Sequence, residues 1–460
     1  MHSRPLRVAI IGAGPAGIYA ADALMKSDTA TTRGVSIDLF ERMPAPFGFI
    51  RYGVAPDHPR IKAIITALHK VLDKPHVRLF GNIDYGTDIT LEDLQQFYDA
   101  VVFSTGAEDD RALDIPGIEL DGSFGAAEFV SWYDGHPDKP RQWPLTAEKV
   151  AVLGVGNVAL DVARILAKTA EELLPTEIPP NVYAGLQANR AVEVHVFGRR
   201  GPAQAKFTPM ELRELDHSPT IEVVVDPADI DYDAASDAAR RASKQVDMVA
   251  NVLQDWAIRD PGDRPHKLFL HFFESPHEIL GEDGKVAALR TERTELDGTG
   301  NVRGTGHFTD WDVQAVYRAV GYLSTALPAL PFDHASGTIP NEAGRVIGHD
   351  SRPVPGVYVT GWIKRGPVGL IGHTKGDANE TIACLLSDTA HLPTATHPSE
   401  DAVVEFLERL QLPYTTWDGW YLLDAYERSL GEPHGRERIK VVEREEMLAA
   451  SRRNQPQHVH

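Results

Sequence analysis

The first 41 residues constrain the fold more than any other stretch of the chain. An apolar run at residues 7–11 leads directly into Gly-Ala-Gly-Pro-Ala-Gly at 12–17, and an alanine-rich stretch follows. A second apolar run at 35–40 then ends on Glu41. A strand, a tight glycine turn, a helix and a second strand in this order predict a parallel βαβ unit.

Each glycine of the turn has a physical use. Gly12 permits the tight turn, Gly14 lets an anionic group approach the backbone, and Gly17 lets the helix pack closely on the strand. The N–H groups at the start of the helix favour a pyrophosphate. Glu41 is placed where an acid accepts hydrogen bonds from ribose hydroxyls. The stretch therefore predicts a dinucleotide site.

Size and composition narrow the function classes. A chain of 460 residues predicts two or three domains. The net charge of −20 argues against wholesale binding to nucleic acid or anionic membranes. The single cysteine, Cys384, excludes a disulfide framework, a Cys-ligated iron–sulfur cluster and a redox-active dithiol. We find neither a secretory signal nor a stretch of roughly 18 apolar residues, and expect a cytoplasmic protein.

A second unit of the same kind begins at residue 150. The apolar run 150–153 precedes Gly-Val-Gly-Asn-Val-Ala at 154–159, and the next apolar run, 192–197, leads to Arg199 and Arg200 instead of an acid. A 2′-phosphate on the adenosine ribose needs cations, and an acid at this place would repel it. The two arginines therefore predict NADP(H) in preference to NAD(H).

Four further segments predict the rest of the secondary structure. Residues 99–107 and 314–322 are similar apolar strands that contain a glycine near the end, so each closes one nucleotide unit. Residues 268–311 alternate apolar and polar positions around glycine turns, which predicts antiparallel strands. Residues 357–372, followed by a helix, form a third place where N–H groups can face a ligand.

Several short segments of the sequence resemble those of one known protein family. They are Phe47-Gly48, the run 51–59 (Arg-Tyr-Gly-Val-Ala-Pro-Asp-His-Pro), 156–164 (Gly-Asn-Val-Ala-Leu-Asp-Val-Ala-Arg), 198–202, 211–215, 361–367 (Gly-Trp-Ile-Lys-Arg-Gly-Pro) and 431–436. In these blocks the chain resembles the adrenodoxin-reductase type of ferredoxin–NADP reductase, above all its actinobacterial members. This family belongs to the flavoproteins of the glutathione-reductase fold, and the resemblance covers nearly the whole chain.

The resemblance implies an α/β fold with two Rossmann-like domains: residues 1–108 and 324–460 would bind FAD, and residues 109–323 would bind NADP(H). FAD would be held by Gly12, Gly14, Ala16, Gly17, Glu41, Phe49, Tyr85, Trp362, Gly369, Leu370 and Ile371. NADP(H) would be held by Val155, Gly156, Asn157, Val158, Arg199, Arg200, Glu211 and Gly369. No metal site is implied.

The same resemblance places His58 and Glu211 near the nicotinamide as the catalytic pair. An ion pair between them would favour the charged imidazole and orient the nicotinamide ring. Hydride transfer itself needs no proton, so neither residue is expected to be indispensable. From the residues alone, Pro-Asp-His-Pro is typical of a capped turn with an exposed histidine.

The expected activity follows from electron counting. NADPH delivers two electrons as a hydride, whereas an iron–sulfur protein accepts one at a time, and a flavin can do both. The resemblance therefore implies an FAD-dependent reductase that passes electrons from NADPH to a ferredoxin. A diaphorase acting on quinones and a non-catalytic NADPH-sensing flavoprotein stay open as alternatives, whereas a disulfide reductase lacks its second cysteine.

The expected partner conflicts with the charge of the chain. Ferredoxins are typically acidic, and this chain carries −20, so docking requires local positive charge. Candidates are Arg240, Arg241 and Lys244 on a helical stretch, and Lys364 with Arg365 in the loop at 361–367. We favour the first group, because the second is expected to be committed to the cofactor. A monomer is expected.

Overall fold

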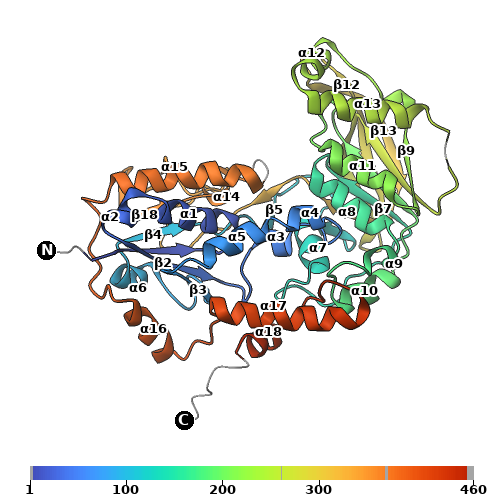
Figure 1. The fold of residues 1–460 in the computed structure, drawn as a ribbon. Coiled ribbons are helices and arrows are strands. Elements are labelled where there is room, and N and C mark those ends of the chain that lie inside the picture. The colour runs from blue at the N-terminus through green and yellow to red at the C-terminus, as the bar shows by residue number, and fades with distance from the viewer. Residues whose placement is uncertain (1–3, 261, 368–370, 453–460) are drawn as a thin grey trace. The chain divides into compact units, whose positions relative to one another are not determined.

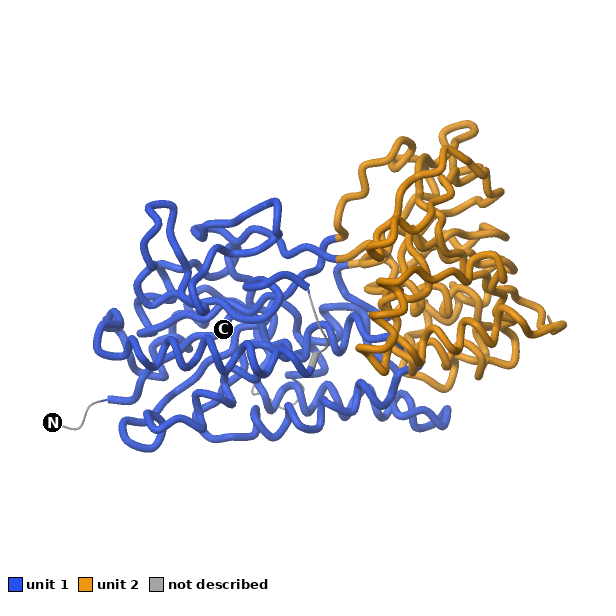
Figure 2. Tube along the Cα trace, turned by 90° about the horizontal axis from the view of Figure 1, so that it is seen from above, with its two compact units in different colours: residues 1–109, 134–138, 322–460 blue, residues 110–133, 139–321 orange. Residues whose placement is uncertain are grey.

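A computed structural model describes residues 4–260, 262–367 and 371–452. The chain divides into two compact units (Figure 2). Unit 1 comprises Met1–Asp109, Asp134–Asp138 and Tyr322–His460, and unit 2 comprises Asp110–Tyr133 and Lys139–Gly321. The short strands β5 (Asp109–Asp110) and β15 (Tyr322–Leu323) lie where the chain passes from one unit to the other.

In the described part of unit 1, seven strands form one sheet in the order β16-β17-β18-β4-β1-β2-β3. The strands are β1 (Leu6–Ile11), β2 (Val35–Glu41), β3 (Val77–Gly81), β4 (Ala100–Phe103), β16 (Asn341–Glu342), β17 (Arg345–Ile347) and β18 (Pro353–Val359). Strand β1 pairs in parallel with β2 and β4 and is buried along its whole length. Continuous burial is typical of a parallel strand covered on both faces.

Helices cover both faces of this sheet. Val8 and Ile10 of β1 belong to one core cluster, and the alternate residues Ala9 and Ile11 belong to another. Helices α1 and α15 lie side by side on the first face (Figure 1). The helices are α1 (Pro15–Met25), α2 (Asp28–Thr32), α3 (Phe49–Tyr52), α4 (Pro59–Lys62), α5 (Ile65–Leu72), α6 (Leu91–Phe97), α14 (Trp362–Arg365), η3 (Ile371–His373), α15 (Thr374–Ser387), α16 (Glu400–Arg409), α17 (Trp417–Gly431), η4 (Glu432–His434) and α18 (Arg444–Ser451).

Unit 2 is also built around a parallel sheet. Its described strands form a six-stranded sheet in the order β6-β14-β7-β8-β10-β9 and a three-stranded sheet β11-β12-β13. The first consists of β6 (Ser123–Gly125), β7 (Lys149–Leu153), β8 (Glu193–Gly198), β9 (Ile221–Val225), β10 (His266–Phe272) and β14 (Ala315–Arg318). The second consists of β11 (Glu274–Glu282), β12 (Lys285–Leu296) and β13 (Val302–Asp312). Leu153 and Phe197 of the first sheet share a core cluster with Ile279 and Leu289 of the second, so the two sheets pack together.

The helices of unit 2 are α7 (Ala126–Tyr133), α8 (Asn157–Ala167), α9 (Ala170–Leu173), α10 (Pro180–Gln187), η1 (Pro202–Gln204), α11 (Pro209–His217), η2 (Pro227–Asp229), α12 (Ala234–Ala242) and α13 (Lys244–Ile258). The antiparallel strands expected in residues 268–311 are confirmed for β11 to β13. The expectation is wrong for β10, which pairs in parallel with both β8 and β9. Among the described residues no helix is both long and apolar enough to span a bilayer.

Candidate nucleotide sites

The glycine turn after β1 is built as the sequence indicates. Gly12 has φ +104°, and a Cβ there would lie 2.6 Å from the carbonyl oxygen of Ser104. A Cβ on Gly17 would lie 2.1 Å from the carbonyl oxygen of Gly12. At Gly14, by contrast, a Cβ would meet only the Cα of Gly48, at 3.8 Å. The protein itself therefore does not need a glycine at position 14, and the free space suits the approach of a ligand.

Glu41 fastens this turn to the end of β2. Its carboxylate accepts the backbone N–H of Ala13 at 2.8 Å and of Met43 at 3.0 Å. Burial raises the pKa of Glu41, and the two N–H donors partly offset that effect. A carboxylate has about four acceptor positions, so two stay available for ribose hydroxyls. Glu41 is thus a structural anchor of the turn as well as a candidate ribose ligand.

An aromatic cluster of Phe49, Tyr322 and Trp362 gathers in unit 1. The ring centroid of Phe49 lies 5.0 Å from that of Trp362 and 5.8 Å from that of Tyr322. A Cβ on Gly53 would lie 2.3 Å from the Phe49 ring, so the glycine makes room for it. The structure brings the two predicted FAD residues together and adds Tyr322, which the sequence analysis missed. The only available signal was its place directly after the strand that closes the second unit.

Two carboxylates of α15 hold α14 and the loop before it. Asp377 on α15 accepts hydrogen bonds from the hydroxyl of Thr360 at 3.1 Å and from the N–H of Gly361. The Nζ of Lys364 lies 3.0 Å from Asp377 and 2.6 Å from Glu380, and the lysine is buried. Both carboxylates come from one helix, so α15 sets the conformation of this loop.

The structure gives no site geometry for the predicted FAD residues 369–371 and assigns another contact to Tyr85. Gly369 and Leu370 lie outside the described residues, and Ile371 opens the 3-10 helix η3 directly before α15. Tyr85 donates its hydroxyl to the carbonyl of Pro328 at 2.7 Å and packs against Phe103 with ring centroids 4.9 Å apart. Burial raises its pKa to about 12. Tyr85 therefore serves the core of unit 1, and its contact with FAD stays a prediction.

The second glycine turn lies at the end of β7. Gly154 has φ +132°, and a Cβ there would lie 2.3 Å from the carbonyl oxygen of Ala319. A Cβ on Gly156 would meet nothing within 4 Å, and α8 begins directly after it without a side-chain cap. The N–H groups of Asn157 and Val158 open the helix there. The turn thus offers open space and helix N–H groups, which together suit a pyrophosphate. Val155 packs against the end of β8, because a Cβ on Gly198 would lie 2.5 Å from its side chain.

Arg199 and Arg200 follow β8 directly. Arg199 is exposed and Arg200 is half-buried. Thr294 donates its hydroxyl to the carbonyl of Arg199 at 2.8 Å, which fixes the backbone. Within the described parts of the chain, neither guanidinium forms an ion pair, so both charges are available to a phosphate.

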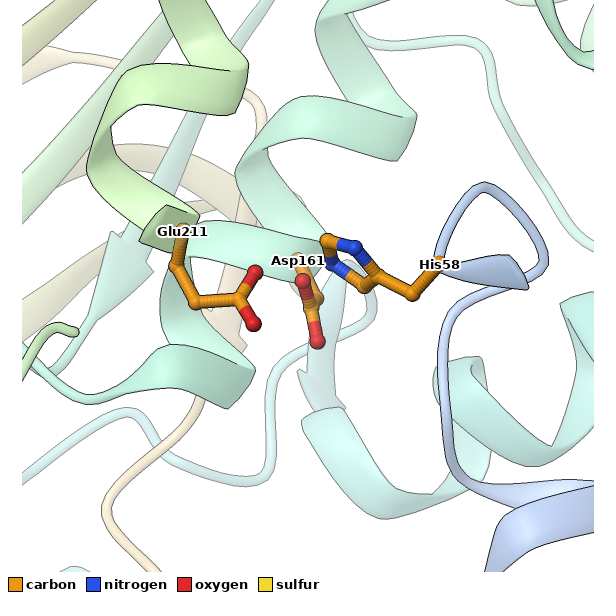
Figure 3. A group of neighbouring side chains, drawn as sticks. All are labelled: His58, Asp161 and Glu211. Atoms are coloured by element: carbon orange, nitrogen blue, oxygen red, sulfur yellow. The ribbon is translucent and has the colours of Figure 1, made fainter. Parts of the chain in front are cut away.

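Glu211 lies in the first turn of α11, whose start is tied to α8. The N–H of Glu211 donates to the hydroxyl of Thr208, and the side-chain oxygen of Asn157 accepts the N–H of Thr208 at 2.9 Å. Figure 3 shows Glu211 beside Asp161 of α8, and a carboxylate oxygen of each lies within 4.8 Å of the other. The guanidinium of Arg164 serves both, at 2.8 Å from Asp161 and 3.9 Å from Glu211.

His58 belongs to unit 1, where it directly precedes α4. Its pairing with Glu211 of unit 2 stays a prediction. Asp161 and Arg164 were not singled out from the sequence. The available signal was their spacing of three residues on a helix, which places a carboxylate and a guanidinium on one face.

Comparison with known proteins places the chain in a family. The family described as pyridine nucleotide-disulphide oxidoreductase matches residues 6–204. The chain is 40% identical over 457 residues to the NADPH-ferredoxin reductase FprA of Mycobacterium tuberculosis, covering 97% of this chain and 99% of the relative. It is 37% identical to the mitochondrial NADPH:adrenodoxin oxidoreductase of Bos taurus, covering 96% and 91%.

A solved structure of M. tuberculosis FprA in complex with NADPH has a TM-score of 0.89 and 40% identity to this protein. The match covers 97% of this chain and all of that chain. These similarities span both units, and they confirm the expected fold of two Rossmann-like domains. The chain therefore belongs to the family of NADPH–ferredoxin reductases that includes adrenodoxin reductase.

Proposed function

We propose that this protein is a flavoenzyme that transfers electrons from NADPH, through FAD, to an iron–sulfur protein of the ferredoxin type. One observation carries the proposal. The chain holds two open glycine turns, one fastened to an acid, Glu41, and the other followed by two available cations, Arg199 and Arg200. An acid suits a ribose diol and cations suit a 2′-phosphate, so the two sites take two different nucleotides.

Unit 1 fits FAD. The space at Gly14 would admit the pyrophosphate, α1 begins there, and Glu41 would have acceptor positions left for the ribose hydroxyls. A Cβ on Gly361 would lie 2.6 Å from Ala16, so the start of α1 and the loop held by Asp377 form one wall of the site. The aromatic cluster of Phe49, Tyr322 and Trp362 supplies apolar surface for the flavin ring. When bound, FAD supplies the conversion between two-electron and one-electron transfer.

Unit 2 fits NADPH. The turn at Gly156 and the first N–H groups of α8 hold the pyrophosphate, and Arg199 with Arg200 hold the 2′-phosphate. We expect Glu211 to orient the nicotinamide, and the part of His58 in this stays the prediction made from the resemblance. The residues of this chain thus bind and align the hydride donor, and no side chain has to move a proton in the transfer itself.

The structure changes the list of docking candidates. Arg240 is committed to its own unit: its guanidinium bonds Asp247 at 3.0 Å and Asn251 at 2.9 Å, and lies 4.7 Å above the Tyr232 ring. Arg241 and Lys244 are exposed. Lys364 is not a docking candidate, because it is buried and forms ion pairs with Asp377 and Glu380. We therefore place ferredoxin docking at Arg241 and Lys244.

The deciding experiment mixes the purified holoprotein with NADPH and follows both flavin absorbance and cytochrome c reduction. We expect rapid bleaching of the flavin, and cytochrome c reduction that rises steeply when a ferredoxin is added. Bleaching without a ferredoxin effect, together with fast quinone reduction, would favour a diaphorase. NADPH binding without any bleaching would favour a sensor.

We further infer that the protein works as a monomer in the cytoplasm, because a single chain carries residues for both nucleotides. Analytical ultracentrifugation of the holoprotein should give the mass of one chain, 50.5 kDa plus FAD. A dimer mass at micromolar concentration would replace the monomer assignment, and fractionation of the source cells tests the compartment.

A further inference from the structure

The segment that carries the two predicted phosphate ligands is fixed along its backbone. Thr294 of β12 donates its hydroxyl to the carbonyl of Arg199 at 2.8 Å. Phe273 donates its N–H to the carbonyl of Arg200 at 3.3 Å. The Phe273 ring lies against the next residue, because a Cβ on Gly201 would be only 2.5 Å from it. We call these three successive residues the arginine segment, and Phe273 with Thr294 the clamp.

The clamp itself has a fixed position within unit 2. Phe273 and Thr294 are both buried, and the N–H of Thr294 donates to the carbonyl of Phe273 at 2.8 Å. The guanidinium carbon of Arg293 lies 5.5 Å from the centroid of the Phe273 ring. Arg293 in turn pairs with Asp229 at 2.6 Å and with Glu274 at 3.3 Å. Each part of the clamp is therefore held by a neighbour.

Phe273 holds a backbone conformation that glycine would adopt more easily. It lies between β10 and β11 with φ +59°, in the left-handed region that bulky residues rarely occupy. A glycine would fit this turn without strain, but it would place no ring against Gly201. Residues in such conformations persist where surrounding contacts fix them, and they gather at functional sites. The ring therefore needs an explanation besides the turn.

The side chains of Arg199 and Arg200 supply that explanation. Among the described residues neither guanidinium forms an ion pair, so its position depends on the backbone from which the side chain extends. Ordering long side chains on a ligand costs conformational entropy, and a backbone that is fixed in advance lowers this cost. Only a coenzyme with a 2′-phosphate gains from this order, because NADH has no phosphate there for the guanidinium groups to bind.

We propose that the clamp positions Arg199 and Arg200 for the 2′-phosphate and thereby sets how strongly this protein discriminates NADPH from NADH. Phe273 and Thr294 are positioning residues that act through the backbone of the arginine segment. The proposal rests on the proposed function, because the two arginines must hold the 2′-phosphate. Loosening the clamp should therefore weaken the binding of NADPH and leave the use of NADH unaffected.

The test uses the purified holoprotein and two readouts. Ferricyanide reduction gives kcat and KM for NADPH and NADH. Isothermal titration calorimetry gives Kd for adenosine 2′,5′-bisphosphate, which carries the 2′-phosphate without a nicotinamide. Thr294→Val removes the hydroxyl and keeps the branched shape, so KM for NADPH and Kd for the bisphosphate should rise roughly three- to tenfold, with kcat unchanged and the NADH constants within about twofold. Thr294→Ser keeps the hydroxyl and should behave as the wild type.

A second variant disturbs the clamp from the other side. In Gly201→Ala the new Cβ would displace either the Phe273 ring or the arginine segment, so the same two constants should rise. This variant decides the question if Thr294→Val does not fold. The matched control is Thr176→Val: Thr176 of unit 2 also donates its hydroxyl to a backbone carbonyl, that of Leu173, at 2.6 Å. All its constants should equal those of the wild type.

Two outcomes would overturn the proposal. Equal losses with NADPH and NADH in Thr294→Val would show a structural defect, and a wild-type Kd for the bisphosphate would show that the clamp does not position the arginines. A failure of the proposed function gives a different result. In that case the wild type itself would use NADPH and NADH equally well, or would not bind the bisphosphate.

Discussion

Replacing both Arg199 and Arg200 by alanine should abolish the preference for NADPH over NADH that we predict for this protein. The two guanidinium groups follow β8, and the described residues show neither of them in an ion pair. Removing them therefore breaks no ion pair among the described residues. The backbone at Arg199 stays fixed by Thr294, whose hydroxyl bonds the carbonyl and not the side chain.

The magnitude follows from exposure. A hydrogen bond to a charged group contributes about 1.5–3 kcal/mol. Because Arg199 is exposed and Arg200 is half-buried, water screens both, and the lower end of that range applies. Each arginine should then be worth about tenfold, and the pair about 100-fold, in kcat/KM for NADPH. The value for NADH, which has no 2′-phosphate, should change by less than about twofold.

Steady-state ferricyanide reduction with each coenzyme measures both values in one assay, because this small acceptor needs no docking surface. Arg190→Ala is the matched control, since Arg190 is a solvent-exposed arginine of unit 2 that pairs with Glu148. It should leave both coenzymes unaffected. Equal losses with NADPH and NADH in the double variant would refute the reasoning and make the two arginines structural.

Four further outcomes are expected. Gly14→Val should give a folded protein without flavin absorbance, because a side chain there meets only Gly48 in the protein but blocks the pyrophosphate; an unfolded or yellow variant would contradict this. Glu427→Leu should lower the free energy of unfolding by about 3–5 kcal/mol, because it removes the carboxylate that accepts two hydrogen bonds from the guanidinium of the buried Arg51. The double variant Glu427→Leu with Arg51→Met should regain most of this free energy, and urea titrations measure both values. Burial lowers the pKa of His271 to about 3, whereas in the unfolded chain the pKa of this group is near 6.5. The neutral, buried His271 therefore contributes fully to stability above pH 6.5, and the free energy of unfolding declines as the pH falls below that value. In His271→Gln the loss of unfolding free energy between pH 7.5 and 4.5, measured by chemical unfolding, should be smaller by about 2 kcal/mol. Arg241→Glu with Lys244→Glu should slow ferredoxin-dependent cytochrome c reduction several-fold at low salt and leave ferricyanide reduction intact; a loss of both activities would exclude this docking surface.

The two nucleotide turns could be predicted from the sequence, because the conformation of such a turn depends on its own residues. Gly12 and Gly154 adopt positive φ angles, and a Cβ there would clash with the carbonyl oxygens of Ser104 and Ala319, so both positions require glycine. The residue at the end of the second strand of each unit, or directly after it, is then expected to select the nucleotide. Glu41 and Arg199 could be interpreted without coordinates, because a βαβ unit always brings that position beside the turn.

Which charged side chains are available to a partner could not be predicted from the sequence and became visible only in the folded structure. Lys364 and Arg240 look like docking residues in the sequence, but carboxylates on neighbouring elements bind both of them. Tyr85 is expected to contact FAD only from the resemblance, and the structure adds that its hydroxyl donates to a carbonyl more than 240 residues away. An ion pair depends on which elements the fold places side by side, and no local pattern contains that information.

The residues Asp161 and Arg164 of α8 show the same division. The spacing of Asp161 and Arg164 is a helical pair that any periodicity analysis can find. Glu211 joins them only because α11 packs on α8, 50 residues further along the chain. Local spacing determines that the guanidinium of Arg164 meets the carboxylate of Asp161, and long-range packing determines that it also meets that of Glu211.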